Sequence, residues 1–245
     1  MDNTLLVSLS QQLAAYRSMD VIANNLANLS TPAFKREAVK FEELVQQVQP
    51  SEDQTGPQTV SFVKDTGVVR DLNEGRLDKT GAPFDLAIGD KGYFVVQTAA
   101  GDRYTRNGHL TLNGDGQLVT DSGDPIMGDG GAITITADDG DVHIATDGTV
   151  SGKQGQIGKL RLVNFDNERA LQKEGVSLYS TAQSQTAVDK PNILQGTLET
   201  SNVEPVIEIS HMIDVMRAYQ ATTTLSQSED DLKRQAIDKL GSTPN

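Results

Sequence analysis

The stretch VIANNLANLSTPAFKRE, residues 21–37, marks the point at which a predicted helix gives way to extended chain. Apolar side chains recur at steps of three and four from Leu6 to Leu29, which predicts an amphipathic helix over about residues 4–29. Pro32 then ends the helical pattern, because the residue before a proline is disfavoured in the α region. The N-terminal end of the chain is therefore expected to be helical.

Glycine separates the two ends of the chain from its middle. Of the 22 glycines, all but one lie between Gly56 and Gly196. Glycine is costly inside helices and common in tight turns, so this distribution predicts helical ends and a turn-rich middle.

The C-terminal end repeats the helical pattern. Apolar residues are in phase from Val206 to Ala236, and Pro205 stands where the first turn of a helix tolerates proline. We therefore expect a second helix over about residues 204–240. The two seams have a period near 3.5, so the ends pair as a coiled coil or pack into a larger helical layer. Two ordinary core helices of a globular fold fit the pattern equally well.

The middle of the chain is typical of an antiparallel β meander. Strand patterns over Tyr93–Thr98, His109–Leu112 and Gln117–Thr120 alternate with turns that contain glycine, and Asn113–Gly116 is a strong hairpin signal. The fold class predicted for the whole chain is therefore α+β, with terminal helices that pair and a central, mostly antiparallel β domain.

Composition shifts give the expected domain boundaries. Residues 1–45 form the N-terminal part of a helical domain, and residues 46–60, which are polar and contain two prolines, form a linker. Residues 61–192 form the β domain, with a second polar link over residues 182–192. Residues 193–245 form a return segment and the C-terminal helix.

Charge and composition exclude several classes of protein. The net charge of −13 and the absence of a basic stripe argue against nucleic-acid binding and against anionic membrane surfaces. No apolar run approaches the roughly 20 residues that a membrane helix needs, so no direct membrane insertion is expected. The chain has no cysteine, and its first residues lack the pattern of a cleaved secretory signal peptide.

No catalytic, metal or cofactor site is expected. The acidic turns at residues 113–116, 121–124 and 138–141 do not complete an EF-hand frame, and Asp, Asn and Gly are the residues that β-turns favour. The histidines are far apart, and no nucleophile elbow, P-loop or dinucleotide-binding fingerprint is present. A binding or structural role is therefore favoured over catalysis.

Two long motifs resemble those of a known family, the flagellar basal-body rod and hook proteins. In the first, the segment Ala23–Asn28 is similar to the family's A-N-N-[LI]-A-N core, and Thr31–Lys35 to the T-x-[GA]-F-[KR] that follows, with alanine at position 33 where glycine is common. In the second, residues 194–221 are similar to G-x-[LI]-E-x-S-N-V followed by M-I-x-x-x-R-A-Y. The middle segments GYFVVQ, RYTRNGHLTLNGDGQLVT and KLRLVNFDN also fit the family.

This resemblance implies a structural, non-enzymatic subunit of the bacterial flagellar basal body. It implies that terminal helices of many copies pack into the periplasm-spanning rod, which serves as drive shaft and export channel. The implied partners are copies of the chain, other rod proteins and the flagellar type III export apparatus, with delivery that needs no cleaved signal peptide. Within the family the chain is most similar to the proximal-rod member, and a distal-rod or hook-type member is the close alternative.

The resemblance also gives a role to the asparagines of the first motif. Asparagine is a poor helix former, but an amide between subunits tolerates no misregister, because a shifted partner leaves it unsatisfied. The competing interpretation is that Asn28 helps to end the helix and that the other asparagines face water. The residues expected at contacts between subunits are Leu9, Leu13, Ile22, Asn24, Asn25, Leu26, Asn28, Phe34, Asn202, Val203, Met212, Ile213, Met216, Arg217 and Tyr219.

Two other interpretations remain open at this point. One is a carbohydrate- or calcium-binding β module with helical oligomerisation tails, and the other is a hydrolase with a cryptic site. The rod interpretation predicts protease-sensitive ends and a resistant middle of roughly residues 60–190 in the monomer, because isolated helices are marginal in water.

Overall fold

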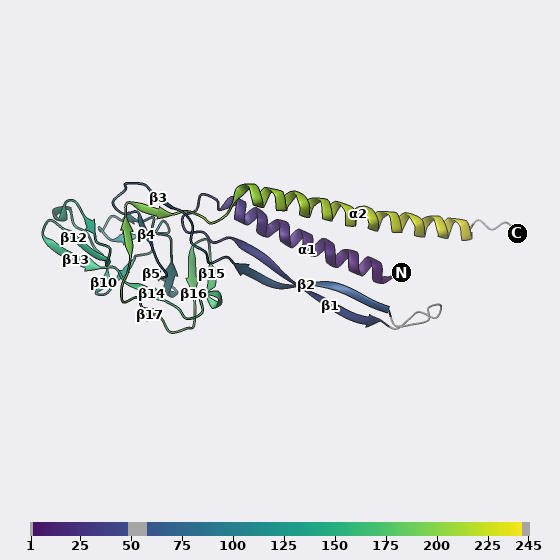
Figure 1. Cartoon of the computed structure of the whole chain (residues 1–245), viewed down its shortest axis with the longest axis horizontal. Coiled ribbons are helices and arrows are strands. Elements are labelled where there is room, and N and C mark those ends of the chain that lie inside the picture. Colours follow the sequence, from purple (N-terminus) through teal and green to yellow (C-terminus); the bar gives the residue numbers. More distant parts are fainter. Residues whose placement is uncertain (1, 49–57, 242–245) are drawn as a thin grey trace. The chain divides into compact units, whose positions relative to one another are not determined.

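A computed structural model describes residues 2–48 and 58–241 (Figure 1). The chain forms two compact units that interleave in sequence. The helical unit comprises Met1–Ala27, Glu37–Arg70 and Glu204–Asn245, and the β unit comprises Asn28–Arg36 and Asp71–Val203. The α+β class expected from the sequence is confirmed, with a helix near each end and a central antiparallel β region.

Two long helices dominate the helical unit. Helix α1 spans Asp2–Ala27 and helix α2 spans Pro205–Gly241, and the two lie side by side and contact each other, with α2 extending beyond α1 (Figure 1). Pro205 occupies the first position of α2, where a missing N–H costs nothing. The predicted helices therefore exist, with α1 ending two residues earlier than expected. Neither described helix combines the length and the apolar character that crossing a membrane requires.

The helical unit also contains a β-hairpin that the sequence did not suggest. Strands β1 (Glu37–Val48) and β2 (Gln58–Arg70) pair antiparallel, and both contact α1. Residues 37–45 are therefore strand, although they were assigned to the N-terminal helical part. Of the expected linker over residues 46–60, the segments 46–48 and 58–60 belong to the hairpin, and residues 49–57 lie outside the described part of the chain.

The β unit is built on a six-stranded sheet with the order β15-β16-β6-β5-β14-β17, in which all neighbours are antiparallel. The bounds of these strands are Gln172–Glu174 (β15), Leu178–Ser180 (β16), Gly101–Thr105 (β6), Tyr93–Thr98 (β5), Leu162–Asn164 (β14) and Thr186–Ala187 (β17). Strand β5 lies where the sequence predicted it. Strand β17 lies within the expected link over residues 182–192.

Smaller β elements surround this sheet. They are β7 (Thr111–Leu112), β8 (Leu118–Val119), β9 (Met127–Gly128), β10 (Gly131–Ala132), β11 (His143–Ile144), β12 (Thr149–Gly152) and β13 (Gly155–Lys159), with short 3₁₀ helices at Ala137–Asp139 and Glu168–Ala170. Strands β7 and β8 form the hairpin predicted around the Asn113–Gly116 turn. The main core lies between the sheet and these elements and includes Leu86, Phe94, Leu118 and Ile126.

The β unit is completed by chain that the sequence assigned elsewhere. Strand β18 (Ile193–Gln195) pairs with β4 (Leu86–Ile88), and β19 (Thr197–Glu199) pairs with β3 (Leu77–Lys79). The β unit therefore extends to Val203, beyond the predicted boundary at residue 192.

Candidate assembly surface

The helical unit leaves much of its apolar surface exposed to solvent. Val21 and Ile22 are buried near the end of α1, whereas Leu9 is 46% exposed and Leu13 is 63% exposed. The large apolar residues exposed on the two helices are Leu6, Leu9, Leu13, Tyr16, Val206, Ile207, Ile209, Ile213, Met216, Leu225, Leu232, Ile237 and Leu240. Large apolar side chains exposed in this number along two helices are typical of an interaction surface.

The hairpin adds to this surface. Phe41, Leu44, Val45, Val68 and Val69 are exposed on β1 and β2. Within the described residues β1 and β2 pair only with each other, so each strand also has an outer edge without a ladder partner. We refer to the exposed apolar residues of α1, α2 and the hairpin as the assembly surface.

A buried amide fastens the three elements of the helical unit together. The Asn25 side chain is fully buried, and its Nδ2 donates to the Glu37 backbone oxygen at 2.8 Å and to Glu208 Oε2 at 3.0 Å. Its Oδ1 accepts from the Glu37 backbone N–H at 2.9 Å. Asn25 was expected to bridge to a neighbouring subunit, and its amide instead joins α1, the start of β1 and the first turn of α2.

The structure sorts the residues expected at subunit contacts into three groups. The exposed group is Leu9, Leu13, Asn24, Ile213, Met216 and Arg217. The half-buried group is Leu26, Asn28, Asn202, Met212 and Tyr219. The buried group is Ile22, Asn25, Phe34 and Val203. Residues of the buried group pack within the chain, so only the first two groups remain predicted contacts between subunits.

The two sequence motifs meet inside the β unit at a cluster of three charges, Lys35, Arg106 and Glu199, which we call the ion cluster. Lys35 Nζ lies 2.6 Å from Glu199 Oε1, and Arg106 Nε lies 2.9 Å from Glu199 Oε2. Lys35 also donates to the backbone oxygen of Asn73 at 2.8 Å, and the Gly75 N–H donates to Glu199 Oε1 at 3.0 Å. All three charged side chains are buried.

The Glu199 carboxylate pairs with both Lys35 and Arg106, and the pKa values of Glu199 and Lys35 are shifted. Burial alone raises the pKa of Glu199, but the charges of Arg106 and Lys35 outweigh it and hold that pKa below its ordinary value. Burial lowers the pKa of Lys35, because the nearby Glu199 only partly compensates the lost hydration.

Asn202 holds the segments next to the ion cluster. Its Oδ1 accepts from the Arg36 backbone N–H at 2.6 Å, and its Nδ2 donates to the backbone oxygens of Asp71 at 3.1 Å and Asn73 at 2.9 Å. The SNV motif therefore bonds to the segment that follows the first motif and to the chain that leaves the hairpin. Its half-buried amide is occupied by backbone groups of its own chain.

Sequence reasoning did not identify the ion cluster. Lys35 and Glu199 stood within the quoted motifs, but no pairing between them was suggested. Arg106 stands among the strand and turn residues of the middle, where nothing in the local pattern separates a buried arginine from an exposed one. The buried Glu208 was likewise overlooked.

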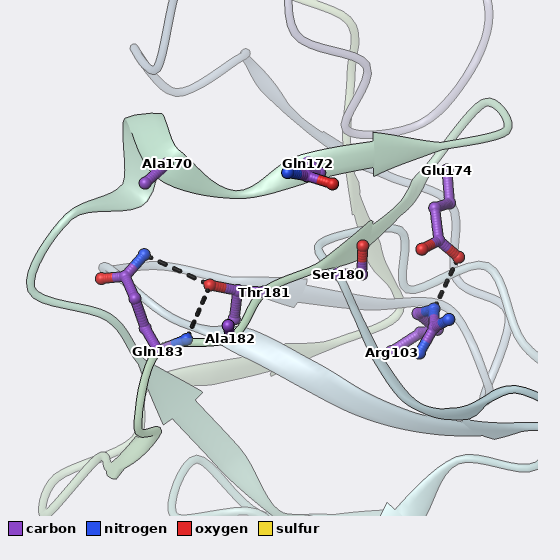
Figure 2. A pocket seen from close by; sticks show the side chains of 8 residues that line it. All are labelled: Arg103, Ala170, Gln172, Glu174, Ser180, Thr181, Ala182 and Gln183. Atoms are coloured by element: carbon purple, nitrogen blue, oxygen red, sulfur yellow. Dashed lines mark hydrogen bonds and ion pairs between the residues drawn. The ribbon is translucent and has the colours of Figure 1, made fainter.

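A polar groove of about 560 Å³ lies beside β15 and β16 (Figure 2). Four of its polar side chains bond in pairs: Arg103 Nε lies 2.6 Å from Glu174 Oε2, and Gln183 Nε2 donates to Thr181 Oγ1 at 3.3 Å. Among the described residues, no group of His, Cys, Asp or Glu side chains could hold a metal ion. These observations give no specific support to a carbohydrate- or calcium-binding module.

Comparisons with known proteins agree with the motifs. The family model for flagella basal body rod proteins matches residues 5–35, that for the D1 domain of flagellar hook protein FlgE/F/G matches residues 87–152, and that for the C-terminal part of the rod FlgEFG proteins matches residues 194–239.

Similar whole proteins include three flagellar basal-body rod proteins. The chain is 41% identical to FlgF of Caulobacter vibrioides over 98% of this chain and 99% of the relative. It is 34% identical to FlgF of Mesorhizobium japonicum over 99% of both. It is 35% identical to FlgG of Buchnera aphidicola from Acyrthosiphon pisum over 88% of this chain and 91% of the relative.

Proposed function

Because the chain belongs to the flagellar basal-body rod protein family, we propose that it is a structural subunit of the rod whose terminal helices pack against those of neighbouring copies. The observation that carries this proposal is the assembly surface, in which apolar side chains follow α1 and α2 without cover from the chain itself. Burial of each such Leu or Ile side chain contributes roughly 1.5–3 kcal/mol, so several of them per contact favour association.

The proposal includes how the helices pack. The seam of α1 and α2 extends into a coiled-coil-like layer when further copies cover Leu9 and Leu13 on one helix and Ile213 and Met216 on the other. Arg217 and Tyr219 act as anchors in this layer, since Arg and Tyr are enriched at the centres of interfaces.

The finer assignment is the proximal rod, which the FlgF relatives support over the FlgG relatives through their higher coverage of the chain. The partners are copies of this chain and the rod proteins next to them, in the periplasm-spanning part of the basal body. Delivery through the flagellar export apparatus without a cleaved signal peptide belongs to the same proposal, and the subunit has no enzymatic role.

One pair of substitutions on α1 tests the assembly surface. Leu13→Glu places a carboxylate within the proposed seam, and Gln11→Glu, two residues away at another exposed position, is the matched control. We expect Leu13→Glu to reduce the amount of assembled rod and the swimming of cells at least tenfold, because a charge would have to be buried unpaired. Gln11→Glu should leave both unchanged.

The measurement is the yield of rods in purified basal bodies, with the cellular amount of the subunit held equal. Circular dichroism of the purified variants shows whether either substitution unfolds the monomer. Normal rods built from the Leu13→Glu variant would contradict the proposed seam.

A further inference from the structure

The last part of the β unit to be synthesised, residues 193–203, reaches several distant parts of that unit. Strand β18 pairs with β4, and β19 pairs with β3. The Ala33 N–H donates to the backbone oxygen of Glu199 at 2.8 Å, and the Asn202 N–H donates to that of Phe34 at 3.2 Å. We call residues 193–203 the closing segment.

The closing segment also completes the core and its buried polar groups. The Ile193 side chain is fully buried within the main core. Gln195 accepts from the Ile144 N–H at 3.1 Å and donates to the backbone oxygens of Pro83 at 2.9 Å and Val142 at 3.0 Å. Without this segment the core would open to water along β4, and these backbone groups would lose their partners.

Glu199 carries the largest share of this dependence, because it is the carboxylate that both buried cations contact. Arg106 is held in place by the backbone oxygens of Ile88, Asp90 and Gly92 at 3.1–3.3 Å, so its guanidinium cannot simply turn toward solvent. Removing one partner of a buried ion pair is strongly destabilising, because a buried charge loses its close counter-charge. The other carboxylate near Arg106, that of Glu74, lies farther away at 3.7 Å and is half-exposed.

We propose that the stability of the entire β unit depends on the closing segment, and chiefly on its residue Glu199. The unit stays unfolded while the closing segment is detached, and it folds as a whole when Glu199 pairs with Lys35 and Arg106. A chain that is synthesised from its N-terminus therefore has no stable β unit until about residue 203 has been added. This inference concerns folding within one chain and does not rest on the proposed function.

The test uses the full-length monomer and hydrogen exchange measured by mass spectrometry. Glu199→Gln removes the negative charge of the ion cluster, and Glu204→Gln makes the same chemical change at an exposed position five residues away. We expect Glu199→Gln to raise the rate of hydrogen exchange at least tenfold throughout the β unit. This includes β5 and β14 of the six-stranded sheet, which lie outside the closing segment. Glu204→Gln should match the parent chain.

A milder variant covers the case in which Glu199→Gln does not fold. Ile193→Val removes one methyl group from the closing segment. It should raise the rate of hydrogen exchange in the closing segment and in the six-stranded sheet by one common factor of roughly 2 to 10. Complete loss of protection against hydrogen exchange in Glu199→Gln, together with this common factor in Ile193→Val, supports the proposal. In either variant, faster exchange confined to residues 28–36, 71–88 and 193–203 would overturn it, since the rest of the unit would then be stable on its own.

Discussion

Among the described residues other than glycine, Ala33 alone has a positive φ, at 56°. This value lies in the left-handed region, which costs an L-residue roughly 1–2 kcal/mol. Ala33 holds this conformation because its N–H donates to Glu199 and because the buried Phe34 follows it directly. The sequence had marked position 33 as one where glycine is common, and the backbone supplies the physical reason.

Ala33→Gly is therefore expected to stabilise the β unit. The gain should be up to about 1 kcal/mol, because part of the relieved strain is offset by the greater freedom of glycine in the unfolded chain. Urea denaturation followed on the β unit measures it. Ala170→Gly, in the 3₁₀ helix Glu168–Ala170, is the control and should destabilise instead. A loss of stability in Ala33→Gly would show that the turn is not strained.

The stability of the β unit should fall in acid through Glu199. A carboxyl group whose folded pKa lies below its unfolded value stabilises the fold fully above the unfolded value, and this contribution is lost as the pH falls through the folded pKa. The pKa of Glu199 is lowered from 4.5, so the loss should begin below about pH 4.5.

The measurement is the urea midpoint between pH 7 and pH 3 for the parent chain and for Lys35→Met, which removes one of the two cations. Lys35→Met should show a weaker loss between pH 4.5 and pH 3, because Glu199 then keeps only Arg106 and the Gly75 N–H among the groups that lower its pKa. The lowered pKa values of the exposed carboxyls Asp139, Asp147 and Glu174 are common to both proteins. Equal slopes would show that Lys35 does not influence the ionisation of Glu199.

At the scale of elements, the two helices were predictable and the hairpin was not. The apolar residues of an amphipathic helix recur every three or four positions, so the helix can be predicted without knowledge of the fold. Strands β1 and β2 carry few of the signals of buried strands, because much of their surface is exposed and the segments 46–48 and 58–60 lie in a polar stretch. Both strands contact α1, and the Asn25 amide bonds the start of β1, and these contacts are not local in sequence.

Asn25 is the residue through which the hairpin and both helices can be tested together. Asn25→Ala should destabilise the helical unit by about 1–3 kcal/mol, because the backbone groups of Glu37 and the Glu208 carboxylate lose a buried partner. Hydrogen exchange in α1, the first turn of α2 and the start of β1 should rise together. Gln11→Ala, at an exposed position of the same helix, is the control. If both variants behaved alike, the amide bonds would contribute nothing measurable.

At the scale of the whole molecule, the chain divides into units that sequence patterns describe only approximately. The helical ends and the β-rich middle followed from the distribution of glycine. The interleaving of the two units in sequence could not be predicted from glycine, because it depends on pairings between residues far apart, such as the ion pair of Lys35 with Glu199. The β unit includes residues 28–36 and 193–203, so a protease-resistant middle limited to residues 60–190 would lack both of these segments.

The bonds between the two motifs also have a mechanical consequence. The chain leaves α1 through Ala33 and Phe34 and reaches α2 through Glu199 and Asn202, and these two short segments are bonded directly to each other. A force that pulls these two segments of the β unit apart would therefore act first on those few bonds, although about 160 residues separate the segments in sequence.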